Sequence, residues 1–130
     1  MRQCHESPPD QLLQAIRQFN SRQWFECHET LEDLWIGEEG EVRDLFQGIL
    51  QVAVALHHWR NGNYEGAVIL FNGGAKLLGR VSDACLRVDV ARLSADATRM
   101  RVALEELGRE RMHDVDDSLV PQLRTVSGRR

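Results

Sequence analysis

Seven polar residues in the segment 24–63 are of types that can bind a ligand or a metal ion, or transfer protons. They are His28, Glu29, Glu32, Arg43, Gln47, Gln51 and His58. Intervals of four, four and seven residues place the last four on one stripe of a predicted helix at 41–60. His28 and Glu32 share one face of the preceding helix. Because a short turn at 37–40 makes the two helices antiparallel neighbours, we predict that the seven side chains face one another.

Counting back from this turn brings Glu32 close to Arg43, and three interpretations are open. The residues form an internal polar network in which these two pair, since buried charges need partners. Alternatively, they bind a metal ion, although HETLE at 28–32 lacks the second histidine of the zinc motif HExxH. Alternatively, they line a small-molecule pocket in which Arg43 holds an anion and Trp24 or Trp35 forms a wall. We predict no metal and no cofactor.

Composition and charge exclude several classes of protein. The net charge of -4 and the isoelectric point near 5.7 argue against a nucleic-acid-binding protein, which usually has a basic face. No apolar run reaches the ~18 residues that a transmembrane helix needs. The first ten residues also lack the apolar segment of a signal peptide. We therefore predict no nucleic-acid partner and no membrane partner.

The three cysteines, Cys4, Cys27 and Cys85, are odd in number and widely spaced. This pattern is neither a disulfide framework nor a CxxC zinc motif, so we predict a reducing, cytoplasmic setting. Cys27 lies on the apolar stripe of its helix, which indicates a core position rather than a nucleophile.

Apolar residues recur at helical spacing in five segments, at 10–20, 24–35, 41–60, 64–80 and 89–108. The third is apolar on most sides, which predicts a buried central helix. A shift of forty residues aligns the first two helices with the next two, as expected for two antiparallel helical hairpins. The turn at 62–68 resembles that of a tetratricopeptide repeat. We predict an all-α fold, a compact bundle of about five helices, in one domain over 1–108 with a tail at 109–130 that is draped or disordered.

Four segments together resemble the family known as domain of unknown function 309. They are FNSRQWFECHETLEDLW at 19–35, RDLFQGILQVAVALHHWRNGN at 43–63, Gly66-Ala67 and VDVARL at 88–93. The resemblance covers about 19–107 and implies a small all-helical protein without an established activity. It also implies that a signature falls on His28, Glu29, Glu32, Trp35, Arg43, Gln47, Gly48, Gln51, Ala53, His58, Gly62, Asn63, Gly66 and Ala67.

Two functions fit these observations. The first is a small helical binding or interaction module that holds a small molecule or a peptide in a polar cleft between the second and third helices. The second is a hydrolase-type enzyme, metal-dependent or not, that uses His28, Glu29, Glu32 and Arg43. Apolar positions on the outer sides of the fourth and fifth helices also predict a homodimer.

Overall fold

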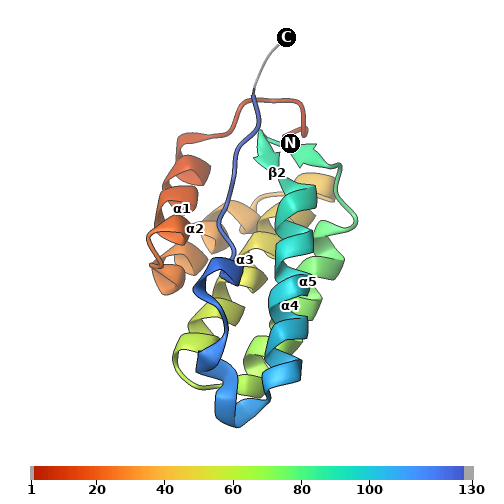
Figure 1. Cartoon of the computed structure of the whole chain (residues 1–130). Coiled ribbons are helices and arrows are strands. Elements are labelled where there is room, and N and C mark those ends of the chain that lie inside the picture. The colour runs from red at the N-terminus through yellow and green to blue at the C-terminus, as the bar shows by residue number, and fades with distance from the viewer. Residues whose placement is uncertain (1, 128–130) are drawn as a thin grey trace.

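The computed structural model describes residues 2–127, and five α-helices make up most of this part of the chain (Figure 1). They are α1 (Asp10–Asn20), α2 (Trp24–Ile36), α3 (Gly40–Arg60), α4 (Tyr64–Leu78) and α5 (Val90–Leu107). Short turns at 21–23 and 61–63 join α1 to α2 and α3 to α4, which gives the two predicted hairpins. The predicted all-α fold is confirmed.

α3 is the central helix, as its apolar sequence predicts. It packs against α2 on one side and α4 on the other. Leu45, Ile49, Val52 and Leu56 on α3 are completely buried. The opposite stripe of α3 faces outward, and most of the polar residues singled out in the sequence lie on it.

α3 and α4 approach closely where two glycines face each other. A Cβ atom added to Gly74 would lie 3.0 Å from the carbonyl oxygen of Gly48 and 2.8 Å from a methyl group of Val52. A side chain at Gly74 would therefore meet backbone. The approach explains why α4 keeps a glycine whose flexibility costs about 1 kcal/mol relative to alanine.

The turn between α3 and α4 ends one helix and begins the next. Gly62 has φ of +82°, and the amide of Asn63 donates to the carbonyl of His58 at 2.8 Å, as in a Schellman motif. The side chain of Asn63 then accepts from the amide of Gly66 at 3.0 Å and caps α4. A glycine followed by asparagine at 62–63 predicts the end of one helix and the cap of the next, and this prediction is confirmed. The likeness to a tetratricopeptide turn is not confirmed.

A small antiparallel hairpin, β1 (Ala84–Cys85) and β2 (Val88–Asp89), replaces the predicted plain connector between α4 and α5. Its turn residues Leu86 and Arg87 have φ of 49° and 66°, as a two-residue turn of type I′ requires. Most such turns use Asn-Gly or similar residues, so Leu-Arg gave no turn signal. Leu86 is completely buried, which offsets the strain of its backbone.

The expectation that the cysteines stay unpaired is wrong, because Cys4 and Cys85 form a disulfide. The bond ties the N-terminal segment to the hairpin, where the amide of Leu86 also donates to the carbonyl of Cys4 at 2.7 Å. The two cysteines are 81 residues apart, and their pairing depends on the hairpin that the sequence did not predict. The argument from cysteines to a reducing compartment therefore fails.

The C-terminal segment packs along the bundle. After the short helices η1 (Arg109–Asp114) and η2 (Asp117–Leu119), it runs between α1 and α5 towards β2 (Figure 1). The indole nitrogen of Trp59 donates to the carbonyl of Met112 at 2.8 Å, and Val88 forms an isolated bridge with Thr125. This segment closes one side of α3 and leaves the α2–α3 surface open. Over residues 2–127, no helix is both long and apolar enough to cross a lipid bilayer.

Candidate functional site

The seven residues predicted as a site lie on the outer face of α2 and α3 and not in a closed core. None of the seven is fully buried: Glu29, Glu32 and Arg43 are exposed, and His28, Gln47, Gln51 and His58 are half-buried. An internal, desolvated polar network is therefore not what the helices form. The seven residues lie on an open face of α2 and α3, but their side chains do not all contact one another or line one pocket.

Among residues 2–127, no ion pair joins Glu32 to Arg43. The guanidinium of Arg43 instead lies over the ring of Trp35, with its Cζ 4.8 Å from the ring centroid. Glu32 lies closer to His28, with 3.9 Å between Oε2 and Nε2. The Arg43–Trp35 contact is a cation–π interaction at the surface, and its loss costs far less than the removal of one partner from a buried ion pair.

The expected register is shifted by roughly one to two helical turns. Counting back from the turn at 37–40 predicts His28 near Gln47 or Gln51, whereas in the structure it lines one pocket with Val54 and His57. Helical side chains lean towards the N-terminus of their own helix, and the N-terminus of α2 lies beside the C-terminal part of α3. Counting from the turn ignores this lean, which explains the shift.

A pocket of about 270 Å³ lies where α2 meets the C-terminal half of α3. Its lining residues are Phe25, His28, Val54, His57 and His58. The half-exposed ring of Phe25 lies between two imidazoles, with centroid distances of 5.8 Å to His28 and 5.7 Å to His57. Two of the predicted residues, His28 and His58, thus share a pocket. Glu29, Glu32, Arg43, Gln47 and Gln51 do not line it.

Sequence reasoning missed Phe25, Val54 and His57. The available signal was Phe25, a large apolar residue off the buried stripe of its helix. His57 follows helical spacing onto a different part of α3 from His58, so the pair His57-His58 gives no signal of a shared site in the sequence. Both imidazoles nevertheless line the pocket, because it spans the outer side of α3.

His57 has the most distinctive chemistry in the pocket. Its pKa lies below the usual value because burial disfavours the charged ring, and the positive charge of Arg60 adds to this effect. The amide nitrogen of Asn61 donates to Nε2 of His57 at 3.1 Å, which puts the proton of the neutral ring on Nδ1. Nδ1 is buried and has no hydrogen-bond partner in residues 2–127, and the same holds for Nδ1 of His28.

His58 and Gln51 have structural roles in the packing of α4. Nδ1 of His58 accepts from the side-chain amide of Asn63 at 3.3 Å, which orients this N-cap residue. A Cβ on Gly66 would lie 2.9 Å from the His58 ring, and one on Gly73 would lie 2.4 Å from Oε1 of Gln51. The small residues of α4 thus leave room for polar side chains of α3.

The arrangement does not support the hydrolase interpretation. Glu29 and Glu32 are exposed, and Arg43 is engaged with Trp35. Burial raises the pKa of the Cys27 thiol to about 12, and its Sγ donates to the carbonyl of Ala15 at 3.3 Å, which confirms Cys27 as a core residue. Among residues 2–127, no cluster of three or more His, Cys, Asp or Glu side chains is placed to hold a metal ion.

Comparison with known proteins covers the part of the chain that contains this pocket. The family described as Domain of unknown function (DUF309) matches residues 12–70. The uncharacterized protein YpuF of Bacillus subtilis (strain 168) is 35% identical over 72 residues, which are 54% of this chain and 41% of that protein. An uncharacterized protein of Aquifex aeolicus (strain VF5) is 30% identical over 53 residues, 40% of this chain and 16% of that protein.

The chain thus matches less than half the length of either relative, and the name of neither protein states an activity. The family match at residues 12–70 is shorter than the resemblance inferred from the motifs. It ends within α4 and leaves out the VDVARL segment at the start of α5. Over residues 12–70, which contain α2, α3 and the whole lining of the pocket, the predicted resemblance to the domain of unknown function 309 family is confirmed.

Proposed function

We propose that the protein is a small helical binding module and that the pocket between α2 and α3 receives one large apolar group of a partner. The observation that carries this proposal is the composition of the pocket. Phe25 and Val54 provide apolar walls, and two imidazoles beside them have buried nitrogens without partners among the described residues. Unpaired buried polar groups are rare in folded proteins and often mark places where a ligand or a water binds.

The size of the pocket favours a side chain of a partner segment over a whole small molecule. Its volume of about 270 Å³ lies just below the ~300–1,000 Å³ that is usual for small-molecule sites. An aromatic side chain would stack against Phe25 and lie beside the imidazoles of His28 and His57. We therefore propose a peptide segment with an exposed aromatic residue as the partner.

Titration of ¹⁵N-labelled protein with p-cresol and indole, which mimic tyrosine and tryptophan side chains, tests the pocket. We expect chemical-shift changes at Phe25, Val54 and His57 at millimolar ligand. Phe25→Ala should weaken the binding by about tenfold, because it removes the stacking surface. Ile36→Ala is the matched control, because Ile36 is an exposed apolar residue of α2 that does not line the pocket.

Shift changes spread over the surface, or equal binding by Phe25→Ala and the wild type, would contradict the proposal. Selection of random peptides on the wild-type protein, with counter-selection on Phe25→Ala, then tests the partner class. Enrichment of an aromatic residue at one position supports a peptide partner. Fragment binding without any enriched peptide would favour a small molecule.

We also propose that the chain forms a homodimer through α4 or α5. The support is one exposed apolar residue on each helix, because Ile69 is 65% and Val102 is 42% exposed. A two-fold contact is the commonest way to bury such side chains. Light scattering at micromolar concentration should give a mass of about twice the 14.9 kDa of one chain. Ile69→Lys or Val102→Lys should return the measured mass to that of the monomer. The mass of one chain at all concentrations would contradict the dimer.

The cysteine pattern no longer argues for a cytoplasmic location, because Cys4 and Cys85 form a disulfide and disulfides persist mostly in oxidising compartments. In a reducing cytoplasm, Cys4 and Cys85 should both be thiols despite their ability to pair. Alkylation of freshly lysed cells with a mass-tagged maleimide measures this directly. If Cys4 and Cys85 do not react with the maleimide because they are joined in a disulfide in the cell, the result would count against a cytoplasmic location.

A further inference from the structure

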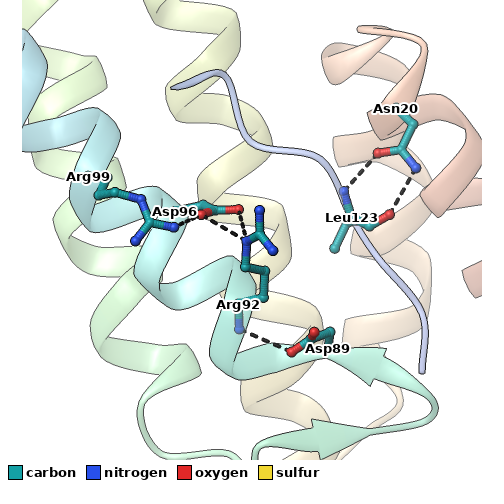
Figure 2. Close-up of polar contacts among 6 residues, drawn as sticks. All are labelled: Asn20, Asp89, Arg92, Asp96, Arg99 and Leu123. Atoms are coloured by element: carbon teal, nitrogen blue, oxygen red, sulfur yellow. Dashed lines mark hydrogen bonds and ion pairs between the residues drawn. The ribbon is translucent and has the colours of Figure 1, made fainter. Parts of the chain in front are cut away.

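A largely buried carboxylate on α5 lies between two arginines and contacts both (Figure 2). Asp96 is only 9% exposed, and both its oxygens accept from Nε of Arg92, at 3.2 and 3.0 Å. Arg99, one turn further along, also donates to Asp96. Because Asp96 is held by both, it fixes the position of two guanidinium groups on the side of α5 that faces the C-terminal segment.

These guanidinium groups keep unused donors. Arg92 contacts Asp96 through Nε alone, and its two terminal nitrogens have no acceptor within residues 2–127. Arg99 uses one terminal nitrogen. Arg124, on the segment that runs past α5, forms no ion pair with any described residue. Guanidinium groups with free, fixed N–H donors are the groups that proteins use to bind phosphate and related anions.

The three arginines surround one small polar pocket between α5 and the C-terminal segment. Its volume is about 100 Å³, and Ser118 and Gln122 add polar side chains to its wall. Three guanidinium groups against the single carboxylate of Asp96 give the pocket a local charge of +2, in a chain whose net charge is -4. The nearby Asp117 is paired with Arg22 at 2.8 Å and does not cancel this charge.

We propose that this pocket binds a phosphate group, and that Arg92, Arg99 and Arg124 hold its oxygens. The volume suits a tetrahedral oxyanion, since it equals about three water molecules at ~30 Å³ each. Asp96 also lines the pocket, and it is a positioning residue because its two oxygens already accept from Arg92 and Arg99 and so orient both arginines. The site is independent of the pocket between α2 and α3, so either proposal stands if the other fails.

Titration of ¹⁵N-labelled protein with inorganic phosphate in a low-salt buffer tests the site. We expect saturable shift changes at Arg92, Arg99 and the 118–124 segment, with weaker binding as sodium chloride is raised. Arg124→Gln should weaken phosphate binding by about tenfold, because one charge-assisted contact is lost. Arg80→Gln, which removes an exposed arginine at the end of α4, should leave it unchanged.

Arg124 forms no ion pair within residues 2–127, so Arg124→Gln should fold normally, and circular dichroism checks this. A parallel titration with phenyl phosphate distinguishes the source of the phosphate group. Binding of both compounds indicates that the site takes a phosphate ester, and binding of inorganic phosphate alone indicates the free ion. No saturable shifts with either compound, or equal binding by Arg124→Gln and the wild type, would overturn the proposal.

Discussion

Asn20 and Leu123 exchange two hydrogen bonds although they are 103 residues apart in the sequence (Figure 2). The side-chain amide of Asn20 donates to the carbonyl of Leu123 at 2.9 Å, and the amide of Leu123 donates to Oδ1 of Asn20 at 2.8 Å. One side chain thus satisfies both backbone groups of a residue in the C-terminal segment. The contact fixes this segment against the end of α1.

Replacement of Asn20 by Ala should destabilise the protein by about 1–3 kcal/mol, because both backbone groups of Leu123 lose their partner. Hydrogen exchange should accelerate at Leu123 before it does in α3. Asn72→Ala, an exposed asparagine on α4, is the control and should change the stability by less than about 0.5 kcal/mol. Equal urea midpoints for the two variants would show that the Asn20–Leu123 contact contributes nothing to stability.

The adjacent glycines of α4 should respond in opposite ways to alanine. At Gly74 the new methyl group would meet the Gly48 carbonyl and Val52, so Gly74→Ala should cost about 1–3 kcal/mol. At Gly73 it would meet only the end of the flexible Gln51 side chain. Gly73→Ala should therefore be neutral or stabilising by up to about 1 kcal/mol through helix propensity. Urea unfolding of both variants checks the prediction, and equal effects would contradict the close helix contact.

Features that follow from local sequence were predicted well. The apolar spacing of α3 and the Gly62-Asn63 signal act through neighbouring residues, so the helices and their main turn followed directly. The Leu86-Arg87 turn is stabilised by burial in the folded protein and has no local signal. The Cys4–Cys85 bond depends on that turn.

The candidate site shows the same limit. Helical spacing placed the polar residues of α2 and α3 on one face. Which residues share a pocket depends on side-chain direction across the helix pair, and counting residues cannot give it. His28 therefore meets His57 and Phe25 instead of Gln47.

The surface position of Arg43 predicts a small effect of its removal. Arg43→Ala should destabilise the protein by about 0.5–1 kcal/mol, the range of an exposed cation–π contact with Trp35. A buried pair with Glu32 would instead cost about 3–5 kcal/mol. Thermal and urea unfolding of Arg43→Ala and Glu32→Gln distinguish the two. If Arg43→Ala lowered the free energy of unfolding by more than about 3 kcal/mol, and the added Glu32→Gln change partly restored it, the buried Glu32–Arg43 pair would be supported instead.

The three cysteines should behave differently towards a thiol reagent. Oxidised protein in its native state should expose no reactive thiol, because Cys27 is buried with a pKa near 12. In denaturant it should show one thiol, and after reduction three. Cys4→Ser should leave two thiols in denaturant without reductant. Three thiols in denatured, unreduced wild-type protein would contradict the disulfide.

Stability should depend on pH through His57. Its pKa in the folded protein is below the usual 6.5, so the fold favours the neutral ring and the unfolded chain binds a proton first as the pH falls. The stabilisation is therefore complete above about pH 6.5 and is lost as the pH falls through the folded pKa. The free energy of unfolding, measured in urea between pH 5 and 7, should fall less steeply in His57→Gln than in the wild type.

His5→Gln, which changes an exposed histidine outside the helices, is the control for this experiment and should keep the wild-type slope. The ring of His57 is surrounded by Arg60, His58 and His28, which oppose its protonation, and by Glu26, which favours it. Burial and the positive groups outweigh the carboxylate. The Cε1 proton of His57 should therefore titrate below 6.5 in the NMR spectrum, and a midpoint above that value would mean that Glu26 dominates.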